Sequence, residues 1–423
     1  MDNRREWLFR SGGQLAALGA GAAALPGTLN ASSAESGGAT SGTASGTAGA
    51  AAGGTAADTA TAGGAALPQA AHAGRTPPDG KAWRIGVISA RIKGKPQKAN
   101  GHTWHFAQYL HPAIDLAVTK KTLDPGSQKY FETIVRNPAC NFGILPFPDT
   151  RITHYYEPDP EIARLFADAF PGVQVATSLE KMAEEVDALW LGDASGTGDD
   201  HFDLLAPGLA KGLPTFCDKP IGETVAGTRK ILEFARQHGA PLMSASIFRY
   251  EWGVEETRRL QAAGELGEIQ YIVASMAGGY SKEGWFIYGQ HPCWSVMTLL
   301  GAGVEAVSLY ARGAAAHGLA TYPDRPPAQL WYGRPDLVGR YNETSVHFTK
   351  GVYRYGPAIE GNFWFGHHYE MFNMARAFRE MVRTGVEPVP HREILEVTAM
   401  IHAGAQSLAE KSRLVALAEV LGE

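Results

Sequence analysis

The chain has 423 residues, of which 44% are hydrophobic and 19% are charged, and its formal net charge is −5. This length and apolar content suffice for two domains with cores of their own. Positive charge is nowhere concentrated enough to indicate a nucleic-acid partner. The cysteines Cys140, Cys217 and Cys293 are widely spaced and odd in number, so they form neither a CxxC motif nor a disulfide framework.

The N-terminal stretch is typical of a protein exported across a membrane. Arg4 and Arg5 precede a weakly apolar run, Leu15 to Leu25, that resembles a twin-arginine signal and is too short for an ordinary membrane span. The alternative is a chance arginine pair on a tail. Residues 31–80 are mainly Ala, Gly, Ser and Thr and cannot form a core. We therefore predict a signal over residues 1–30, then a linker, export of the folded protein to the periplasm or another extracytoplasmic space, and no further membrane span.

A short apolar strand, Trp83 to Ile88, opens the globular part. In a dinucleotide-binding fold a G-x-G-x-x-G loop follows such a strand, because its glycines let the backbone approach the pyrophosphate. Here Ser89, Ala90 and Arg91 follow, so the glycine fingerprint is absent. Lysines further along the loop either hold phosphates by charge or are simply solvated. If a dinucleotide binds, Gly86 and Ser89 are expected beside it.

Histidine and aromatic residues cluster between Asn100 and Pro112. His102 and His105 are three residues apart and could share one face of a helix. The cluster is compatible with a metal site, with a ligand-lining loop or with aromatic packing. Because no nearby carboxylate or cysteine completes a ligand set, we predict no metal site.

The run from Arg151 to Glu157 is predicted to be a strand with an acid at its carboxyl end. An acidic side chain at this place commonly holds the adenine ribose hydroxyls of a dinucleotide. Glu157 is therefore the candidate ribose ligand, and an acid here favours NAD over NADP. Asp159 is the alternative ligand and is also suited to capping the helix that begins near Pro160.

Two more strands are predicted, over residues 173–177 and 187–194. The second contains Asp193 near its end and leads into a short loop that begins at Ser195. His201 starts the helix that follows. Since ligands of parallel sheets lie beyond the carboxyl ends of the strands, we expect Asp193, Ser195 and His201 to line the cofactor cleft.

Lys219 stands just after the next buried strand, Leu213 to Cys217. One helix-length segment separates this strand from the preceding one, which is the spacing of a parallel βαβ unit. A lysine beside an apolar strand end can have its pKa lowered enough to exchange protons near neutrality. The alternative is an ordinary surface lysine in a turn.

The pattern changes after Arg249. A helix over residues 251–263 is followed by β-prone stretches with few helices between them, the last running from 352 to 365, and two helices close the chain. Strands in series indicate an open, mostly antiparallel sheet. We therefore predict an α/β protein, in which residues 81–222 form a doubly wound parallel sheet of the Rossmann type and residues 223–423 form an α+β domain for substrate and subunit contacts.

Four short motifs stand in an order and spacing that point to a family. They run from Val186 to His201, from Lys211 to Pro220, from Gly264 to Ile269, and from Ala403 to Leu417. Together they resemble the Gfo/Idh/MocA oxidoreductases, the group of glucose-fructose oxidoreductase and inositol dehydrogenase. The resemblance implies a Rossmann domain that binds NAD or NADP, and a small carbohydrate substrate.

The resemblance also implies roles for particular residues. The family's Glu-Lys-Pro motif corresponds to Asp218, Lys219 and Pro220, and its lysine contacts both the nicotinamide end and the substrate. A second signature carries an acid/base histidine, which His291 matches, although Ile287 stands where the family has Asp. Lys219 and His291 are thus the expected catalytic residues, and Asp218 is expected beside the cofactor.

Three residues of the second domain are candidates for substrate contact. Arg249 and Tyr288 would support the catalytic pair. Trp285 could stack on a sugar ring, although core packing is the commoner fate of a tryptophan.

Three functions stay open on the sequence alone. The first is a nicotinamide-dependent oxidoreductase that acts on a sugar, polyol or related carbohydrate by hydride transfer. The second is an NAD-dependent glycoside hydrolase of the same fold, which oxidises and re-reduces its sugar within one turnover. The third is a non-catalytic member that binds a carbohydrate. By analogy we also expect a homo-oligomer, either a dimer or a tetramer.

Overall fold

The computed structural model describes residues 75–91, 101–123, 128, 146–193, 196–277, 281–333, 343–356 and 363–422. The predicted signal and most of the predicted linker lie outside these residues, as do Ser195 and the loop lysines of the first domain. In the part of the chain that is described, no helix combines the length and hydrophobicity needed to cross a membrane.

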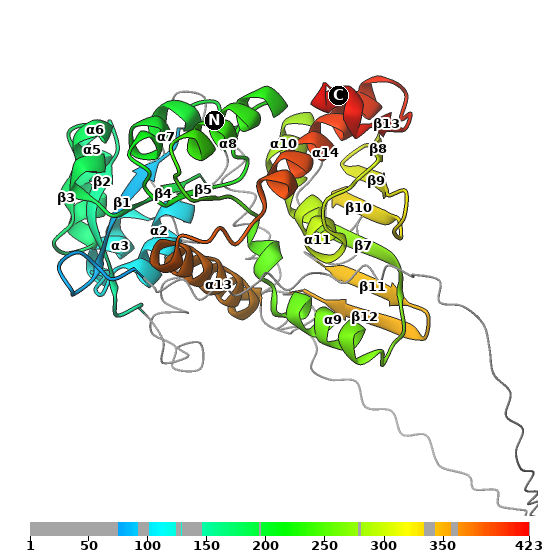
Figure 1. Ribbon diagram of the computed structural model, residues 1–423, viewed down its shortest axis with the longest axis horizontal. Helices are drawn as coiled ribbons and strands as arrows, with labels where there is room; N and C mark the ends of the chain where they lie inside the picture. Colours follow the sequence, from blue (N-terminus) through cyan, green and yellow to red (C-terminus); the bar gives the residue numbers. More distant parts are fainter. Residues whose placement is uncertain are drawn as a thin grey trace, which may run out of the picture. The chain divides into compact units, whose positions relative to one another are not determined.

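Six parallel strands form the first sheet (Figure 1). They are β1 (Trp83–Ser89), β2 (Thr150–Tyr156), β3 (Gln174–Val175), β4 (Ala188–Gly192), β5 (Thr215–Cys217) and β6 (Leu242–Met243). Their order is β3-β2-β1-β4-β5-β6, so strand order reverses between β1 and β4. This is the Rossmann order, and the predicted fold class is confirmed for this domain. Because β6 belongs to the sheet, the sheet continues past residue 222, where the sequence analysis ends the first domain.

Helices alternate with these strands, and polar side chains fix where several of them begin. The helices are α2 (Gly101–Leu110), α3 (Leu116–Thr122), α5 (Pro160–Ala169), α6 (Leu179–Glu185), α7 (His201–Ala210) and α8 (Val225–Gln237). Asp159 caps α5 by accepting from the backbone N–H groups of Glu161 and Ile162. Thr224 caps α8 in the same manner. Such caps satisfy N–H groups that the helix itself leaves unpaired, so the capping role predicted for Asp159 is confirmed.

Stacked aromatic rings hold β4 and β5 together. Trp190 of β4 lies on Phe216 of β5, with ring centroids 3.8 Å apart, and Phe106 of α2 lies 4.6 Å from Trp190. Phe378 of the C-terminal helix α13 (Phe363–Thr384) closes this cluster 5.1 Å from Trp190. Burial of each such ring stabilises the fold by about 1.5–3 kcal/mol. The carboxyl ends of β4 and β5 therefore rest on a rigid core.

Seven strands form the second sheet. They are β7 (Ile269–Ala277), β8 (Ala306–Arg312), β9 (Ala315–Thr321), β10 (Ala328–Gly333), β11 (Thr344–Phe348), β12 (Gly351–Tyr355) and β13 (Val415–Ala416). The order is β12-β11-β7-β10-β9-β8-β13, and neighbouring strands are antiparallel except for β7 and β10. The predicted mostly antiparallel sheet is thus confirmed. The strand predicted over residues 352–365 is too long, since β12 ends at Tyr355 and residue 363 begins α13.

In its described residues, the second domain also contains six further helical segments. They are the 3-10 turn η1 (Ile247–Tyr250), α9 (Trp252–Ala263), α10 (Lys282–Tyr288), α11 (Gln290–Leu300), α14 (His391–Ala409) and α15 (Leu417–Leu421). Gly264 ends α9 in the left-handed conformation, which glycine adopts without strain. A single residue, Gly289, separates α10 from α11. Tyr288 and His291 consequently lie at a helix junction.

Candidate active site

The candidate site lies where β4 and β5 end, next to the first turn of α2. Gly192 closes β4, and a Cβ built there would stand 2.6 Å from Thr103 Oγ1 and 2.8 Å from the backbone nitrogen of Thr103. Any side chain at this position would push α2 away. Glycine therefore permits the close approach that brings His102 of α2 to the end of β5.

Asp218 connects these three elements through its carboxylate. Its Oδ2 accepts from His102 Nδ1 at 2.6 Å and from the backbone N–H of Asp193 at 3.1 Å. Its Oδ1 accepts from the backbone N–H of Lys219 at 2.8 Å. The side chain is buried, and both oxygens are engaged inside the protein. We therefore assign Asp218 to holding the loops, and its predicted contact with the cofactor stays a prediction.

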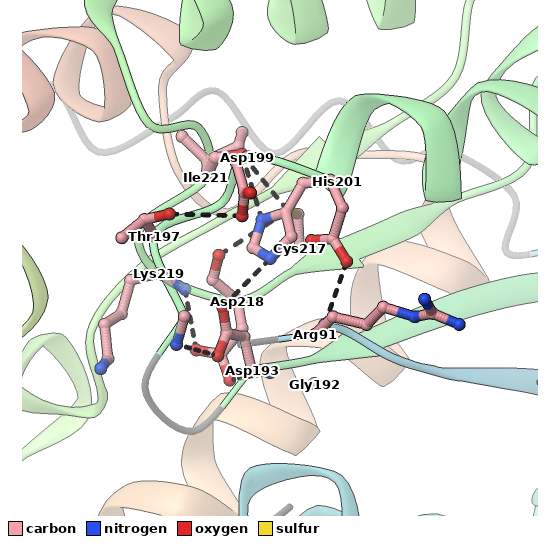
Figure 2. Close-up of polar contacts among 12 residues, drawn as sticks. Arg91, Gly192, Asp193, Thr197, Asp199, His201, Cys217, Asp218, Lys219 and Ile221 are labelled. Carbon is pink, nitrogen blue, oxygen red and sulfur yellow. Dashed lines mark hydrogen bonds and ion pairs between the residues drawn. The ribbon is translucent and has the colours of Figure 1, made fainter. Parts of the chain in front are cut away.

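His201 joins the loops that follow β4 and β5 (Figure 2). It is fully buried, with Nε2 3.2 Å from Asp193 Oδ2 and Nδ1 3.2 Å from the carbonyl oxygen of Ile221. The Cys217 sulfur lies 3.3 Å from the same Nδ1. Burial lowers the pKa of His201, but the contacts with Cys217 and Asp193 outweigh burial and raise it well above its usual value. Since an acceptor faces each ring nitrogen, we assign His201 as an imidazolium.

The partner carboxylate of this imidazolium is Asp193. Burial raises the pKa of Asp193, but His201 and the N–H of Gly196 lower this pKa by more than burial raises it, so the net shift is downward. The 3.2 Å contact is an ion pair whose geometry falls short of a well-aligned hydrogen bond. Both side chains are 0% exposed. Asp193 and His201 therefore brace the loops, whereas the sequence predicts that they line the cofactor cleft.

Lys219 is buried yet points away from these carboxylates (Figure 2). Its Nζ lies 5.4 Å from the centre of the Tyr288 ring, a cation–π distance, and makes no hydrogen bond or ion pair with any described residue. Burial lowers the pKa of the Lys219 ammonium, although the charges of Asp218 and Asp193 act in the opposite direction. A lysine in this state can exchange a proton with a ligand.

Three side chains fix the imidazole of His291 at the start of α11. Ser246 Oγ lies 2.6 Å from its Nδ1. The ring of Phe248 lies 4.7 Å away, and the ring of Tyr288 is nearly parallel to it at 6.3 Å. Tyr288 is thus close to both His291 and Lys219. The two predicted catalytic residues, one from each domain, therefore both lie near this ring, and their catalytic role stays a prediction.

Glu157 follows β2 and carries a buried oxygen that is not hydrogen-bonded. Its Oε1 accepts from the backbone N–H of Asp159 at 3.0 Å. Its Oε2 is buried and has no hydrogen-bond partner in the described part of the chain. Burial raises the pKa of Glu157. A buried acceptor without a donor at this strand end fits the hydroxyl groups of a ribose.

Residues 137–246 match the family model of the Gfo/Idh/MocA group, described as an oxidoreductase family with an NAD-binding Rossmann fold. Over this segment the chain is similar to the Gfo/Idh/MocA oxidoreductases. Inositol 2-dehydrogenase of Corynebacterium glutamicum is 30% identical over 121 residues, which are 28% of this chain and 35% of that protein. The corresponding enzyme of Pseudomonas fluorescens is 32% identical over 87 residues, 20% of this chain and 25% of that protein. The chain thus matches about a third or less of the length of these dehydrogenases.

Solved structures resemble the chain over most of its length. Myo-inositol 2-dehydrogenase from Lactobacillus plantarum has a TM-score of 0.59 at 14% identity and covers 79% of this chain and 99% of its own. Scyllo-inositol dehydrogenase from Lactobacillus casei, solved with NAD(H) and scyllo-inositol, has a TM-score of 0.58 at 15% identity, with 80% and 100% covered. At such identities the likeness shows the fold alone.

Two residues that the sequence predicts beside ligands are packing residues. Gly86 lies inside β1, and a Cβ there would meet Leu189 at 3.0 Å and Met182 at 3.1 Å, so it faces the core and not a cofactor. Trp285 is 1% exposed and donates its Nε1–H to the carbonyl oxygen of Ile401 at 3.0 Å. Its indole therefore lies between α10 and α14 and is not available to a sugar ring.

The contact of Ser89 with the cofactor and that of Arg249 with the substrate stay predictions. Ser89 ends β1 and is fully buried. Arg249 donates to Glu393 Oε2 at 2.6 Å, and its guanidinium lies over the ring of Trp294 at 5.8 Å. Within the described ranges, no three His, Cys, Asp or Glu side chains lie close enough together to hold a metal ion.

Sequence reasoning missed two contacts that position the expected catalytic residues. Ser246 reaches His291 across 45 residues of sequence, and His102 reaches Asp218 across 116. Such contacts leave no local pattern. The one available signal was the density of histidines around His102, for which the sequence left metal binding, ligand contact and packing open.

Proposed function

We propose that this protein is a nicotinamide-dependent oxidoreductase that moves a hydride to or from a hydroxyl-bearing carbon of a sugar, polyol or related carbohydrate. The supporting observation is that Lys219 and His291 both lie near the ring of Tyr288, whose centroid is 5.4 Å from Lys219 Nζ and 6.3 Å from the centroid of the His291 ring. Lys219 follows β5 at the carboxyl edge of the parallel sheet, where ligands of Rossmann folds bind.

Alcohol oxidation requires that the hydroxyl lose a proton while its carbon loses a hydride. The nicotinamide, when bound, supplies the hydride acceptor. Lys219 is suited to take the proton, because burial lowers the pKa of its ammonium and so makes the neutral amine more accessible. His291 is suited to contact the same oxygen, since Ser246 and Phe248 hold its ring in one orientation.

The cofactor is proposed to be NAD, with Glu157 as the ribose ligand. The buried Glu157 Oε2 lacks a donor, and the ribose hydroxyls of NAD would supply one. The 2′-phosphate of NADP would instead place negative charge against the carboxylate.

Replacing Glu157 with Gln is expected to weaken NAD binding about tenfold or more, because hydrogen bonds to charged groups contribute about 1.5–3 kcal/mol. The same change removes the repulsion of NADP, so the preference between the two cofactors should narrow. Titration calorimetry with each dinucleotide measures both effects. Asp159→Asn is the matched control, because Asp159 caps α5 two residues away. Equal losses in both variants would exclude Glu157 as the ribose ligand.

The proposed substrate class follows from two relatives. The chain is partly similar to inositol 2-dehydrogenases, and a protein of the same fold was solved with scyllo-inositol. Inositols and pyranose sugars share a six-membered ring with several secondary hydroxyl groups, and each such carbon can lose a hydride. We therefore propose a ring polyol or a pyranose as the substrate.

Two measurements test the proposal. The purified protein is denatured and the supernatant is analysed for NAD(H), and then inositols and sugars are supplied with NAD while NADH is followed. We expect dinucleotide binding and net NADH formation. Failure to release or bind any dinucleotide would leave a carbohydrate-binding protein as the better description. Release of a sugar with no net NADH would favour the glycoside hydrolase.

A homo-oligomer is proposed on the open face of the second sheet. Tyr310 of β8 is 53% exposed and is paired across the sheet with His317, which is paired in turn with Trp331. Directly paired residues share one face, so this row places aromatic side chains on the face that Tyr310 exposes. Light scattering of the wild type and of Tyr310→Glu tests this, and a monomeric wild type would exclude it.

Export by the twin-arginine route is also proposed, on the strength of Arg4 and Arg5 ahead of the apolar run. Folded export suits an enzyme that takes up a cytosolic cofactor first. Replacing both arginines with lysine should retain the protein in the cytoplasm. If the variant were found in the same cell fraction as the wild type, export by this route would be contradicted.

A further inference from the structure

Ser246 is a buried residue with two neighbours for its hydroxyl group. It is 0% exposed and caps η1, where Oγ accepts from the backbone N–H of Phe248 at 3.1 Å. The same Oγ lies 2.6 Å from His291 Nδ1. Among the described residues these are its hydrogen-bond partners, so the hydroxyl hydrogen has a single acceptor within reach.

The count of donors and acceptors decides where His291 carries its hydrogen. A hydroxyl has one hydrogen and two lone pairs, and a neutral imidazole has one N–H and one bare nitrogen. If His291 Nδ1 carried the hydrogen, Oγ would accept twice and the Ser246 hydrogen would be buried without an acceptor, which folded proteins avoid. If Ser246 donates to Nδ1, its hydroxyl hydrogen has an acceptor and its oxygen accepts from the N–H of Phe248. We propose that Ser246 holds His291 in the tautomer with its hydrogen on Nε2, so that His291 offers a ligand a hydrogen-bond donor and not a proton acceptor.

The residue four positions before His291, which lies in α10, fits this assignment. Ile287, which stands where the family resemblance leads one to expect Asp, is buried and apolar. A carboxylate hydrogen-bonded to Nδ1 would accept its hydrogen and leave a lone pair on Nε2, ready to take a proton. A serine that donates to Nδ1 has the opposite effect. Ile287 supplies no carboxylate, and Ser246 is the residue that contacts Nδ1, so the arrangement favours the hydrogen of His291 on Nε2.

The consequence for the reaction rests on the proposed function. With Nε2 already protonated, Lys219 Nζ would take the hydroxyl proton of the alcohol as the C–O single bond becomes C=O. The nicotinamide, when bound, would supply the acceptor for the hydride that leaves the carbon. His291 Nε2–H donates to that oxygen throughout and stabilises the charge that develops on it. Lys219 is then the base, His291 the electrophile, and Ser246 a positioning residue.

The tautomer can be read without turnover. The full-length protein is labelled with ¹⁵N-histidine, and His291→Gln assigns the ring signals. We expect the Nδ1 signal of an unprotonated nitrogen and the Nε2 signal of a protonated one. The reverse pattern in the wild type overturns the proposal, whether or not the protein proves to be an oxidoreductase.

Variants of Ser246 separate positioning from packing. Ser246→Ala should give a mixture of the two tautomers, and Ser246→Thr should keep the wild-type pattern. Ser295→Ala is the control and should leave the tautomer unchanged, because Ser295 Oγ donates to the backbone carbonyl of His291 at 3.4 Å and not to its ring. If turnover is found, Ser246→Ala should lower kcat by about ten- to a hundredfold with little change in KM, as for other partners that orient a functional histidine. An unaltered tautomer in Ser246→Ala would show that Ser246 does not set it.

Discussion

Replacing Lys219 with Met is expected to lower kcat by about a hundredfold or more, because proton transfer by a positioned side chain typically contributes 10²–10⁴-fold. Methionine keeps the length and apolar contacts of the lysine and removes the amine. NAD affinity, measured by calorimetry, should change little. Lys211→Met is the matched control, since Lys211 lies on the exposed turn before β5 and pairs with Glu184 at 3.2 Å. A Lys219→Met enzyme with the kcat of the wild type would exclude this lysine as the base.

The pH dependence of the wild type gives the same test without mutation. Burial lowers the pKa of Lys219 from its usual 10.5, so the neutral amine is formed at lower pH than for an exposed lysine. For alcohol oxidation the active form is the neutral amine, and kcat/KM should therefore rise with pH along a limb whose midpoint lies below 10.5. This limb should be absent from the residual activity of Lys219→Met.

The central strands of the first sheet can be predicted from sequence because they are short, mainly apolar runs. β1, β4 and β5 are buried at almost every position, which makes each run conspicuous. β9 was not predicted, because its sequence AAHGLAT is mostly Ala and Gly, which favour strands weakly. Its place in the sheet is set by its neighbours β8 and β10 and not by its own residues.

The candidate site could be predicted only where one residue stands at a strand end. Lys219 and Glu157 were found in this way, since the carboxyl ends of parallel strands are where ligands bind. Gly86 was misassigned because sequence gives its strand but not the side of the strand that faces α6. Trp285 was misassigned because its neighbour Ile401 is 116 residues away. The direction of a side chain is a property of tertiary packing, and it decides between core and site.

Replacing Asp193 with Asn is expected to destabilise the fold by about 3–5 kcal/mol, because the imidazolium of His201 would stay buried without its counter-charge. Urea denaturation measures the loss. Asp199→Asn is the control, since Asp199 lies in the same loop, is exposed, and among the described residues accepts one side-chain hydrogen bond, from Thr197 at 3.3 Å. Equal stability of the two variants would show that the Asp193–His201 pair does not brace the loops.

The pH dependence of this loss has a definite sign. The pKa of His201 is raised in the folded state, so its contribution is complete below the usual 6.5 and disappears as pH rises through the folded value. The pKa of Asp193 is lowered, so its contribution is complete above 3.8 and disappears as pH falls through the folded value. The stability difference between the wild type and Asp193→Asn should thus be largest between these two usual values and smaller in alkali. Because the charge of Asp193 also raises the pKa of Lys219, the same variant should shift the alkaline limb of kcat/KM to lower pH. An unchanged midpoint of the kcat/KM profile in Asp193→Asn would show that the charge of Asp193 does not affect the pKa of Lys219.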